Sequence, residues 1–215
     1  MGYDPKESYS GRSPLEALSL NIDMEPDDIV FRVNVVTLTD EEPYAEKTII
    51  DHSAGEISTA DAHILMESIQ EAFNNEEFQF YPGTSYRHIM IWKKGKQVSL
   101  EPPHDHLTQV IGPHLPEEEV LYNFMEKSFD ILNNHPLNIA RAAAGKNKAN
   151  SLWYWGAGTK PSLYSFEGKT GLKGAMISAV DLLKGMGMAT GMQVIEVEGA
   201  TGNYDTNFSG KANAC

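Results

Sequence analysis

The chain has 215 residues, 41% hydrophobic and 22% charged, with a formal net charge of −13. This globular composition excludes disordered and collagen-like chains, and no apolar run approaches the ~18 residues that span a bilayer. The negative charge argues against binding to nucleic acid or to anionic membrane surfaces. The N-terminus has no signal-peptide pattern, and the single cysteine, Cys215, excludes an intramolecular disulfide, so we expect a cytoplasmic protein.

The first 42 residues predict one helix and one strand. Ser13 as N-cap, with Glu16 three residues later, predicts a helix that ends near Asn21. Residues 29–37 are rich in β-branched side chains and predict a strand. Arg32 interrupts this apolar strand and therefore needs a polar partner.

Residues 43–161 predict a compact α+β unit. A turn at 93–96 leads into a further extended segment at 97–100, and the proline-rich residues 102–106 predict a loop without regular structure. The other expected elements are strands at 47–51, 78–81, 86–92 and 151–155, and helices at 58–73, 116–133 and 136–145.

After residue 161 the pattern changes to a strand at 172–178, a helix at 179–188 and a strand at 192–197. This order predicts a βαβ unit with parallel strands. We therefore expect residues 43–161 to form one domain, and residues 1–42 and 162–215 to contribute parts of a second, α/β domain.

His104, Asp105 and His106 have the H-x-H spacing of a metal-binding loop. A metal site needs three or four ligands, and no further Cys or His cluster completes one in the sequence. We therefore predict no metal ligand here and favour contact of His104 with a substrate anion, with a solvated loop as the alternative.

Two further segments carry groups that suit anions. Arg87 stands between Tyr86 and His88 at the start of a strand, where it suits either a carboxylate or phosphate or an intramolecular acid. Lys146 and Asn147 follow a glycine, but the spacing and the helix-to-strand order exclude a nucleotide-binding P-loop. They remain candidates for binding a small anion.

Lys173 opens the first strand of the βαβ unit, and Ser178 and Asp181 lie at its strand-to-helix junction, where open α/β sheets place ligands. Ser178 is equally consistent with a helix N-cap. No nucleophile elbow, zinc-protease motif or Rossmann glycine pattern is present. The residues alone thus indicate several anion-binding groups without a complete catalytic set.

Several stretches together resemble the archaeal-type, cofactor-independent phosphoglycerate mutases of the alkaline phosphatase superfamily. They follow the order found in that family and cover nearly the whole chain. These stretches are GYDP at 2–5, GRSPLEA at 11–17, FRVN at 31–34, DHSAGEIST at 51–59, FYPGTSYRH at 80–88, PPHD at 102–105, GKNKANSLW at 145–153, GLKGAMISAVDL at 171–182, GATG at 199–202 and YDT at 204–206.

The resemblance implies an α/β fold of the alkaline-phosphatase type with an inserted α+β substrate-binding domain. It implies interconversion of 3-phosphoglycerate and 2-phosphoglycerate through a phosphoserine, with two divalent metal ions, manganese or similar, in the full-length enzyme. In that reaction the metals neutralise phosphoryl charge and activate the serine, while basic side chains hold the substrate.

The family's nucleophilic serine and metal ligands have no counterpart here, since they would lie before Met1 and after Cys215. The resemblance therefore implies an internal fragment that binds no metal by itself and is inactive alone. The sequence gives no prediction of its oligomeric state. It implies that Lys173 reaches the phosphate as the catalytic residue. The residues expected to line the substrate cleft are Arg32, Arg87, His104, Asp105, Arg141, Lys146 and Asn147.

Two alternatives to the mutase remain: another metal-dependent phosphatase or phosphomutase of the superfamily, and a non-catalytic binding module. No nucleotide motif supports a kinase. The charge distribution is compatible with an anionic substrate, because residues 1–134 carry a net charge of −16 and residues 135–215 a net charge of +3.

Overall fold

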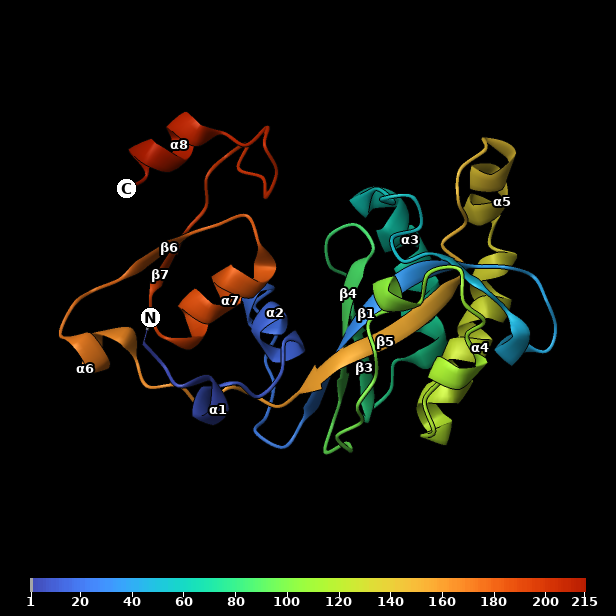
Figure 1. Cartoon of the computed structure of the whole chain (residues 1–215), viewed down its shortest axis with the longest axis horizontal. Coiled ribbons are helices and arrows are strands. Elements are labelled where there is room, and N and C mark those ends of the chain that lie inside the picture. The colour runs from blue at the N-terminus through green and yellow to red at the C-terminus, as the bar shows by residue number, and fades with distance from the viewer. Residues whose placement is uncertain (1) are drawn as a thin grey trace. The chain divides into compact units, whose positions relative to one another are not determined.

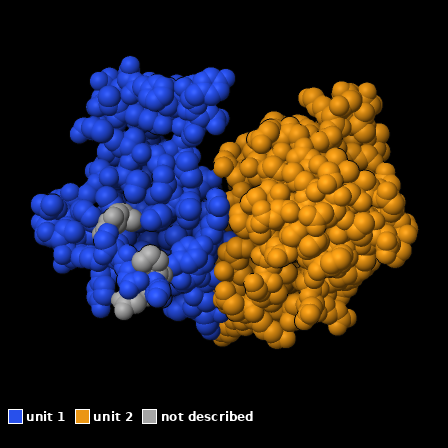
Figure 2. Space-filling model, viewed as in Figure 1, with its two compact units in different colours: residues 1–27, 158–215 blue, residues 28–157 orange. Residues whose placement is uncertain are grey.

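The computed structural model describes residues 2–215, apart from the side chains of Pro5 and Glu7. The chain forms two compact units (Figure 2). Residues 28–157 make up the middle unit, and residues 1–27 with 158–215 make up the terminal unit. The first boundary lies earlier than the predicted residue 43, because the strand that begins at Ile29 is part of the sheet of the middle unit.

The middle unit is built on a five-stranded sheet (Figure 1). Strand β1 pairs antiparallel with both β2 and β4, β4 pairs antiparallel with β3, and β5 also pairs with β1. The strands are β1 (Ile29–Leu38), β2 (Ile49–Asp51), β3 (Phe78–Tyr81), β4 (Arg87–Trp92) and β5 (Ser151–Gly158).

Strand β1 confirms the strand predicted at 29–37, and all ten of its residues are buried. Phe31, Val33 and Val35 belong to the hydrophobic core of the unit. Because successive side chains point to opposite faces, Arg32 and Asn34 project from the other face. The central strand therefore presents one apolar and one partly polar face.

Three helices complete the middle unit: α3 (Thr59–Phe73), α4 (Glu119–Asn133) and α5 (Pro136–Ala143). The Ser58 side chain caps α3 by accepting a hydrogen bond from the Asp61 amide. Helix α4 begins three residues later than predicted from Pro116, because Glu118 is still extended. Side chains from α3 and α4 fill the core against β1, β3 and β5.

Two predictions for the segment after β4 are wrong. No strand forms at 97–100, because β4 is already paired on both sides, with β1 and β3, and offers no free edge. The proline-rich segment forms a short 3-10 helix, η2 (Pro103–His106), rather than irregular loop. Proline suits the first turn of such a helix, where its missing N–H is not needed. The other 3-10 helices are η1 (Tyr44–Glu46) and η3 (Gly112–His114).

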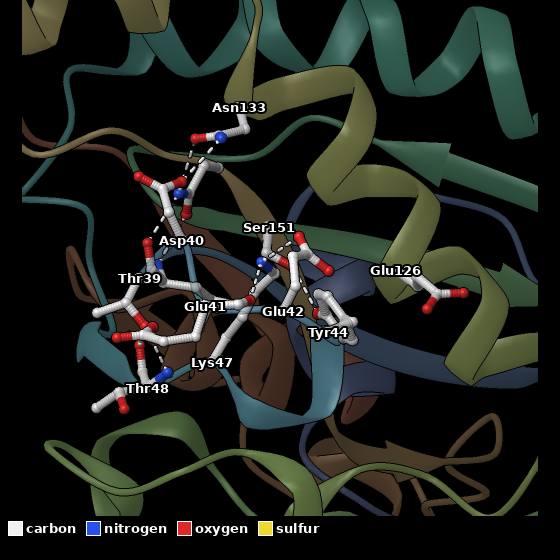
Figure 3. Close-up of polar contacts among 12 residues, drawn as sticks. Thr39, Asp40, Glu41, Glu42, Tyr44, Lys47, Thr48, Glu126, Asn133 and Ser151 are labelled. Carbon is white, nitrogen blue, oxygen red and sulfur yellow. Dashed lines mark hydrogen bonds and ion pairs between the residues drawn. The ribbon is translucent and has the colours of Figure 1, made fainter.

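Lys47, just before β2, is only 1% exposed, and its ammonium group makes two hydrogen bonds (Figure 3). Its ammonium group donates to the Glu41 carbonyl oxygen at 2.6 Å and to Glu42 Oε1 at 2.9 Å. It also lies 3.9 Å from the centre of the Phe129 ring. These contacts offset the cost of burying the charge and anchor the connection between β1 and β2.

In the terminal unit, β6 and β7 pair in parallel with α7 between them, which confirms the predicted βαβ unit. Helix α7 packs on α2, and Gly185 allows this, because a Cβ there would collide with the Leu15 carbonyl oxygen. The elements are α1 (Pro5–Ser8), α2 (Ser13–Ser19), α6 (Phe166–Thr170), β6 (Ala175–Ile177), α7 (Asp181–Ala189), β7 (Gln193–Ile195) and α8 (Phe208–Asn213).

The predicted capping box of α2 does not form. The N-cap is Arg12 rather than Ser13, and its side chain makes no capping hydrogen bond. Instead Arg12 Nε donates to Glu16 Oε1 at 2.7 Å, so Glu16 serves as an ion-pair partner one turn along the helix. Within residues 2–215, no helix is long and apolar enough to cross a membrane.

Candidate functional site

Asn34 joins three segments on the polar face of the central sheet. Its Oδ1 accepts hydrogen bonds from Arg32 Nε and from Trp155 Nε1, both at 3.1 Å, and its Nδ2 donates to the His52 carbonyl oxygen at 3.0 Å. The Arg32 guanidinium also lies 5.6 Å from the centre of the Trp155 ring. These contacts provide the partner that buried Arg32 needs, and they tie β1 to β5 and to the end of β2.

Aromatic and imidazole rings extend this group. The His52 ring centre lies 5.7 Å from Tyr86 and 5.9 Å from His104, and His104 lies 5.6 Å from Trp155. Arg87 pairs with Asn34 in the β1–β4 ladder. We call the whole group the arginine–aromatic cluster; its members are Arg32, Asn34, His52, Tyr86, Arg87, His104 and Trp155.

The arginine–aromatic cluster brings together three of the predicted site residues: Arg32, Arg87 and His104. Arg32 is 4% exposed, whereas Arg87 is partly exposed and the His104 side chain is 47% exposed. Asp105, next to His104, is exposed. Two guanidinium groups beside imidazole and indole rings suit the recognition of carboxylate or phosphate.

Arg141 lies in a second group. Its Nη1 donates to Asp61 Oδ2 at 2.8 Å, its Nη2 to the Ala54 carbonyl oxygen at 2.9 Å and its Nε to the Asn147 carbonyl oxygen at 3.0 Å. The side chain is 6% exposed. Arg141 thus joins the end of α5 to the segment after β2 and to the start of α3.

Asn147 and Asp51 link the two groups. Asn147 Nδ2 donates to Asp51 Oδ2 at 2.9 Å, and the Gly55 amide donates to the same oxygen at 2.7 Å. Burial alone would raise the pKa of Asp51, but hydrogen bonds from Ser53, Asn147 and Gly55 outweigh it and lower that pKa. Asp51 is therefore held as a carboxylate directly beside His52.

A cavity of about 570 Å³ opens beside Arg141, and its lining includes Lys146, Asn147, Asp61 and Ser58. Lys146 is exposed, so its ammonium group is available to a ligand in this cavity. Lys173 belongs to the terminal unit and is exposed just before β6. The predicted site residues therefore fall into the arginine–aromatic cluster, the Arg141 cavity and the loop of Lys173.

His88, on β4, is 1% exposed, and its Nδ1 accepts a hydrogen bond from the Gly83 amide at 3.1 Å. Burial, with smaller contributions from nearby Arg32 and His63, lowers the pKa of His88 to about 3. The side chain is therefore neutral in the folded protein at any pH where the protein is ordinarily studied.

We expect His88 to make the middle unit sensitive to acid. The unfolded chain takes up a proton near pH 6.5 and the folded chain does not, so this stability is present above pH 6.5 and is lost as pH falls. Between about pH 8 and about pH 5.5 the loss is about 1.4 kcal/mol. Urea unfolding at both pH values, for the wild type and for His88→Gln, measures it. An equal pH dependence in both proteins would contradict the assignment.

Asn34, His52, Tyr86 and Trp155 belong to the arginine–aromatic cluster but carry no sequence motif that predicts them as site residues. The first three lie within stretches used for the family resemblance, so position alone could have indicated them. Trp155 directly follows Trp153 and Tyr154, and such an aromatic run is more typical of core residues than of a ligand site. Trp153 and Tyr154 are indeed at most 2% exposed, but Trp155 is partly exposed and donates to Asn34.

The chain is similar to curated proteins over nearly its whole length. A probable 2,3-bisphosphoglycerate-independent phosphoglycerate mutase from Geobacter sulfurreducens is 49% identical, with 99% of this chain and 54% of that protein covered. The 2,3-bisphosphoglycerate-independent phosphoglycerate mutase of Methanosarcina barkeri is 46% identical, with 100% and 54% covered. The chain thus spans about half the length of the curated relatives it matches.

The chain is also similar to solved structures. A protein from Pyrococcus horikoshii has a TM-score of 0.71 and 29% identity, with 99% of this chain and 49% of that chain covered. The cofactor-independent phosphoglycerate mutase from Thermoplasma acidophilum has a TM-score of 0.60 and 28% identity, with 92% and 55% covered. A family model described as 2,3-bisphosphoglycerate-independent phosphoglycerate mutase matches residues 1–138. As the resemblance predicted, the chain belongs to the 2,3-bisphosphoglycerate-independent phosphoglycerate mutase family.

Proposed function

We propose that this chain is the substrate-binding part of a mutase that interconverts 3-phosphoglycerate and 2-phosphoglycerate through a phosphoserine. The middle unit corresponds to the inserted substrate-binding domain and the terminal unit to part of the alkaline-phosphatase-like domain. The observation that carries the proposal is the hydrogen-bonded junction at Asn34, which holds Arg32 and Trp155 in place with Arg87 opposite it in the ladder.

Exposed and buried site residues have different roles: the exposed ones contact the substrate, and the buried arginines support them. Partly exposed Arg87 contacts the substrate carboxylate or phosphate directly, with His104 and Asp105 beside it. Buried Arg32 adds positive potential behind them and is fixed by Asn34. Lys146 and Asn147 contact a second anionic group at the Arg141 cavity, while Arg141 itself positions their loop. Lys173 contacts the phosphate at the serine.

The two-metal centre that the family implies does not fit the residues of this chain. Among residues 2–215, the one group of three potential metal ligands close enough to share an ion is Glu101, His106 and His114, in the middle unit. We therefore assign no phosphoryl-transfer step to this chain, and we expect the 215-residue chain alone to show no turnover of 3-phosphoglycerate.

Tryptophan fluorescence tests the proposal, because Trp155 lies in the arginine–aromatic cluster. We expect 3-phosphoglycerate to change the emission of the 215-residue chain saturably. Glycerol, which carries neither carboxylate nor phosphate, is expected to change nothing. Trp155→Phe should remove the response, and Trp153→Phe serves as its matched control. A wild-type chain that does not respond, or a response unchanged in Trp155→Phe, would count against binding at this cluster.

A further inference from the structure

Glu101, His106 and His114 converge in the middle unit. His106 Nε2 lies 2.9 Å and His114 Nδ1 lies 3.2 Å from the same oxygen, Glu101 Oε2. One potential ligand atom from each residue lies within 4.8 Å of the other two. The three residues come from the segment before η2, from η2 and from η3, so folding alone brings them together.

The state of His106 points to a missing ligand. The residue is 7% exposed, and its Nε2 is buried without a well-formed hydrogen bond to any residue that the structure describes. A buried ring nitrogen without a well-formed hydrogen bond costs free energy, even though Glu101 Oε2 lies only 2.9 Å from it. A cation bound between His106 Nε2 and Glu101 Oε2 would remove this cost.

The surroundings also match those of a metal site. His114 Nε2 lies 3.2 Å from Gln109 Oε1, which suits a ring that binds metal through Nδ1 and donates its other N–H. Trp153 Nε1 donates to the Glu101 carbonyl oxygen at 2.9 Å and fixes the backbone of the acid.

We propose that Glu101, His106 and His114 bind one Zn²⁺ ion, with a water molecule as the fourth ligand. Two imidazoles and one carboxylate are a ligand set that Zn²⁺ commonly takes. The ion would cross-link residues 101–114, the segment that carries His104 and Asp105. Its role is structural, because it fixes the loop that presents these side chains. The proposal is independent of the mutase function and of the family's two-metal centre.

Metal titration of the 215-residue chain, freed of metal by a chelator, tests the proposal. We expect one Zn²⁺ per chain by calorimetry and a visible absorption band of tetrahedral Co²⁺ when Co²⁺ is used instead. Saturating Zn²⁺ should raise the melting temperature by about 5–10 °C. Failure to bind Zn²⁺, or the absence of the Co²⁺ band, would overturn the site.

Variants locate the ion. Glu101→Gln and His114→Ala should weaken Zn²⁺ binding at least about tenfold, whereas Glu117→Gln, an exposed acid nearby, should leave it unchanged. Glu101 is itself exposed, so its variant is expected to fold, and circular dichroism checks this. Unchanged binding in both cluster variants would overturn the assignment. The readout is metal binding, so failure of 3-phosphoglycerate to bind would leave this result unaffected.

Discussion

Replacing Arg141 with alanine is expected to lower the free energy of unfolding of the middle unit by about 2–4 kcal/mol. The side chain makes three hydrogen bonds to Asp61, Ala54 and Asn147, and each of its partners loses a donor in the variant. Asp61 is partly exposed and regains water, so most of the cost falls on the two backbone carbonyls. Urea or thermal unfolding of the 215-residue chain measures the change.

Lys146→Ala is the matched control for this experiment, because Lys146 is a basic residue of the adjoining loop but is exposed. Its effect should stay within about 0.5 kcal/mol. Arg141→Lys should recover only part of the loss, since an ammonium group cannot reproduce the planar fork of donors. If Arg141→Ala is as stable as the wild type, Arg141 does not hold these segments together. The result would then favour direct contact of Arg141 with the substrate.

Replacing Arg87 with alanine is expected to lower kcat/KM of the full-length mutase about 10- to 150-fold. This range corresponds to the loss of one charge-assisted hydrogen bond, about 1.5–3 kcal/mol. Arg87 is partly exposed at the first residue of β4, so the unfolding free energy should change by less than about 1 kcal/mol. Steady-state kinetics and urea unfolding of the same preparation separate the two effects.

Lys94→Ala provides the control for a general loss of positive charge, because Lys94 is exposed in the turn after β4. Its kcat/KM should remain close to that of the wild type. Arg87→Lys should restore little activity if the substrate is bound by two parallel hydrogen bonds. A variant Arg87→Ala that unfolds, or one that retains full activity, would show that Arg87 is structural or dispensable.

The pattern of apolar residues in the sequence predicted those strands and helices in which the apolar positions are the buried ones. Residues 29–37 predicted β1 because β-branched residues suit a strand buried on both faces. The apolar stripe at 58–73 predicted α3, and the alternation of strand and helix after residue 161 predicted the β6–α7–β7 unit. Failure at 97–100 arose from tertiary pairing, since the neighbours of β4 cannot be read from its own residues.

The candidate site was predicted only in part, for a similar reason. Residue type indicated that Arg32 and Arg87 suit anions, but it could not show that Asn34 joins Arg32 to Trp155 across the sheet. Nor could spacing reveal the group of Glu101, His106 and His114, because two 3-10 helices set the geometry between them. Such contacts depend on the path of loops, which hydrophobic periodicity does not describe.

The position of β1 at the centre of the sheet determines when the middle unit can fold during synthesis. Leu38 on β1 exchanges hydrogen bonds with the side chain of Asn150, just before β5, across a sequence separation of 112 residues. At ordinary rates of translation, roughly ten seconds separate the emergence of these two segments from the ribosome. A strand that is buried on both faces must wait that long for its last neighbour, so the nascent middle unit closes only when β5 has been made.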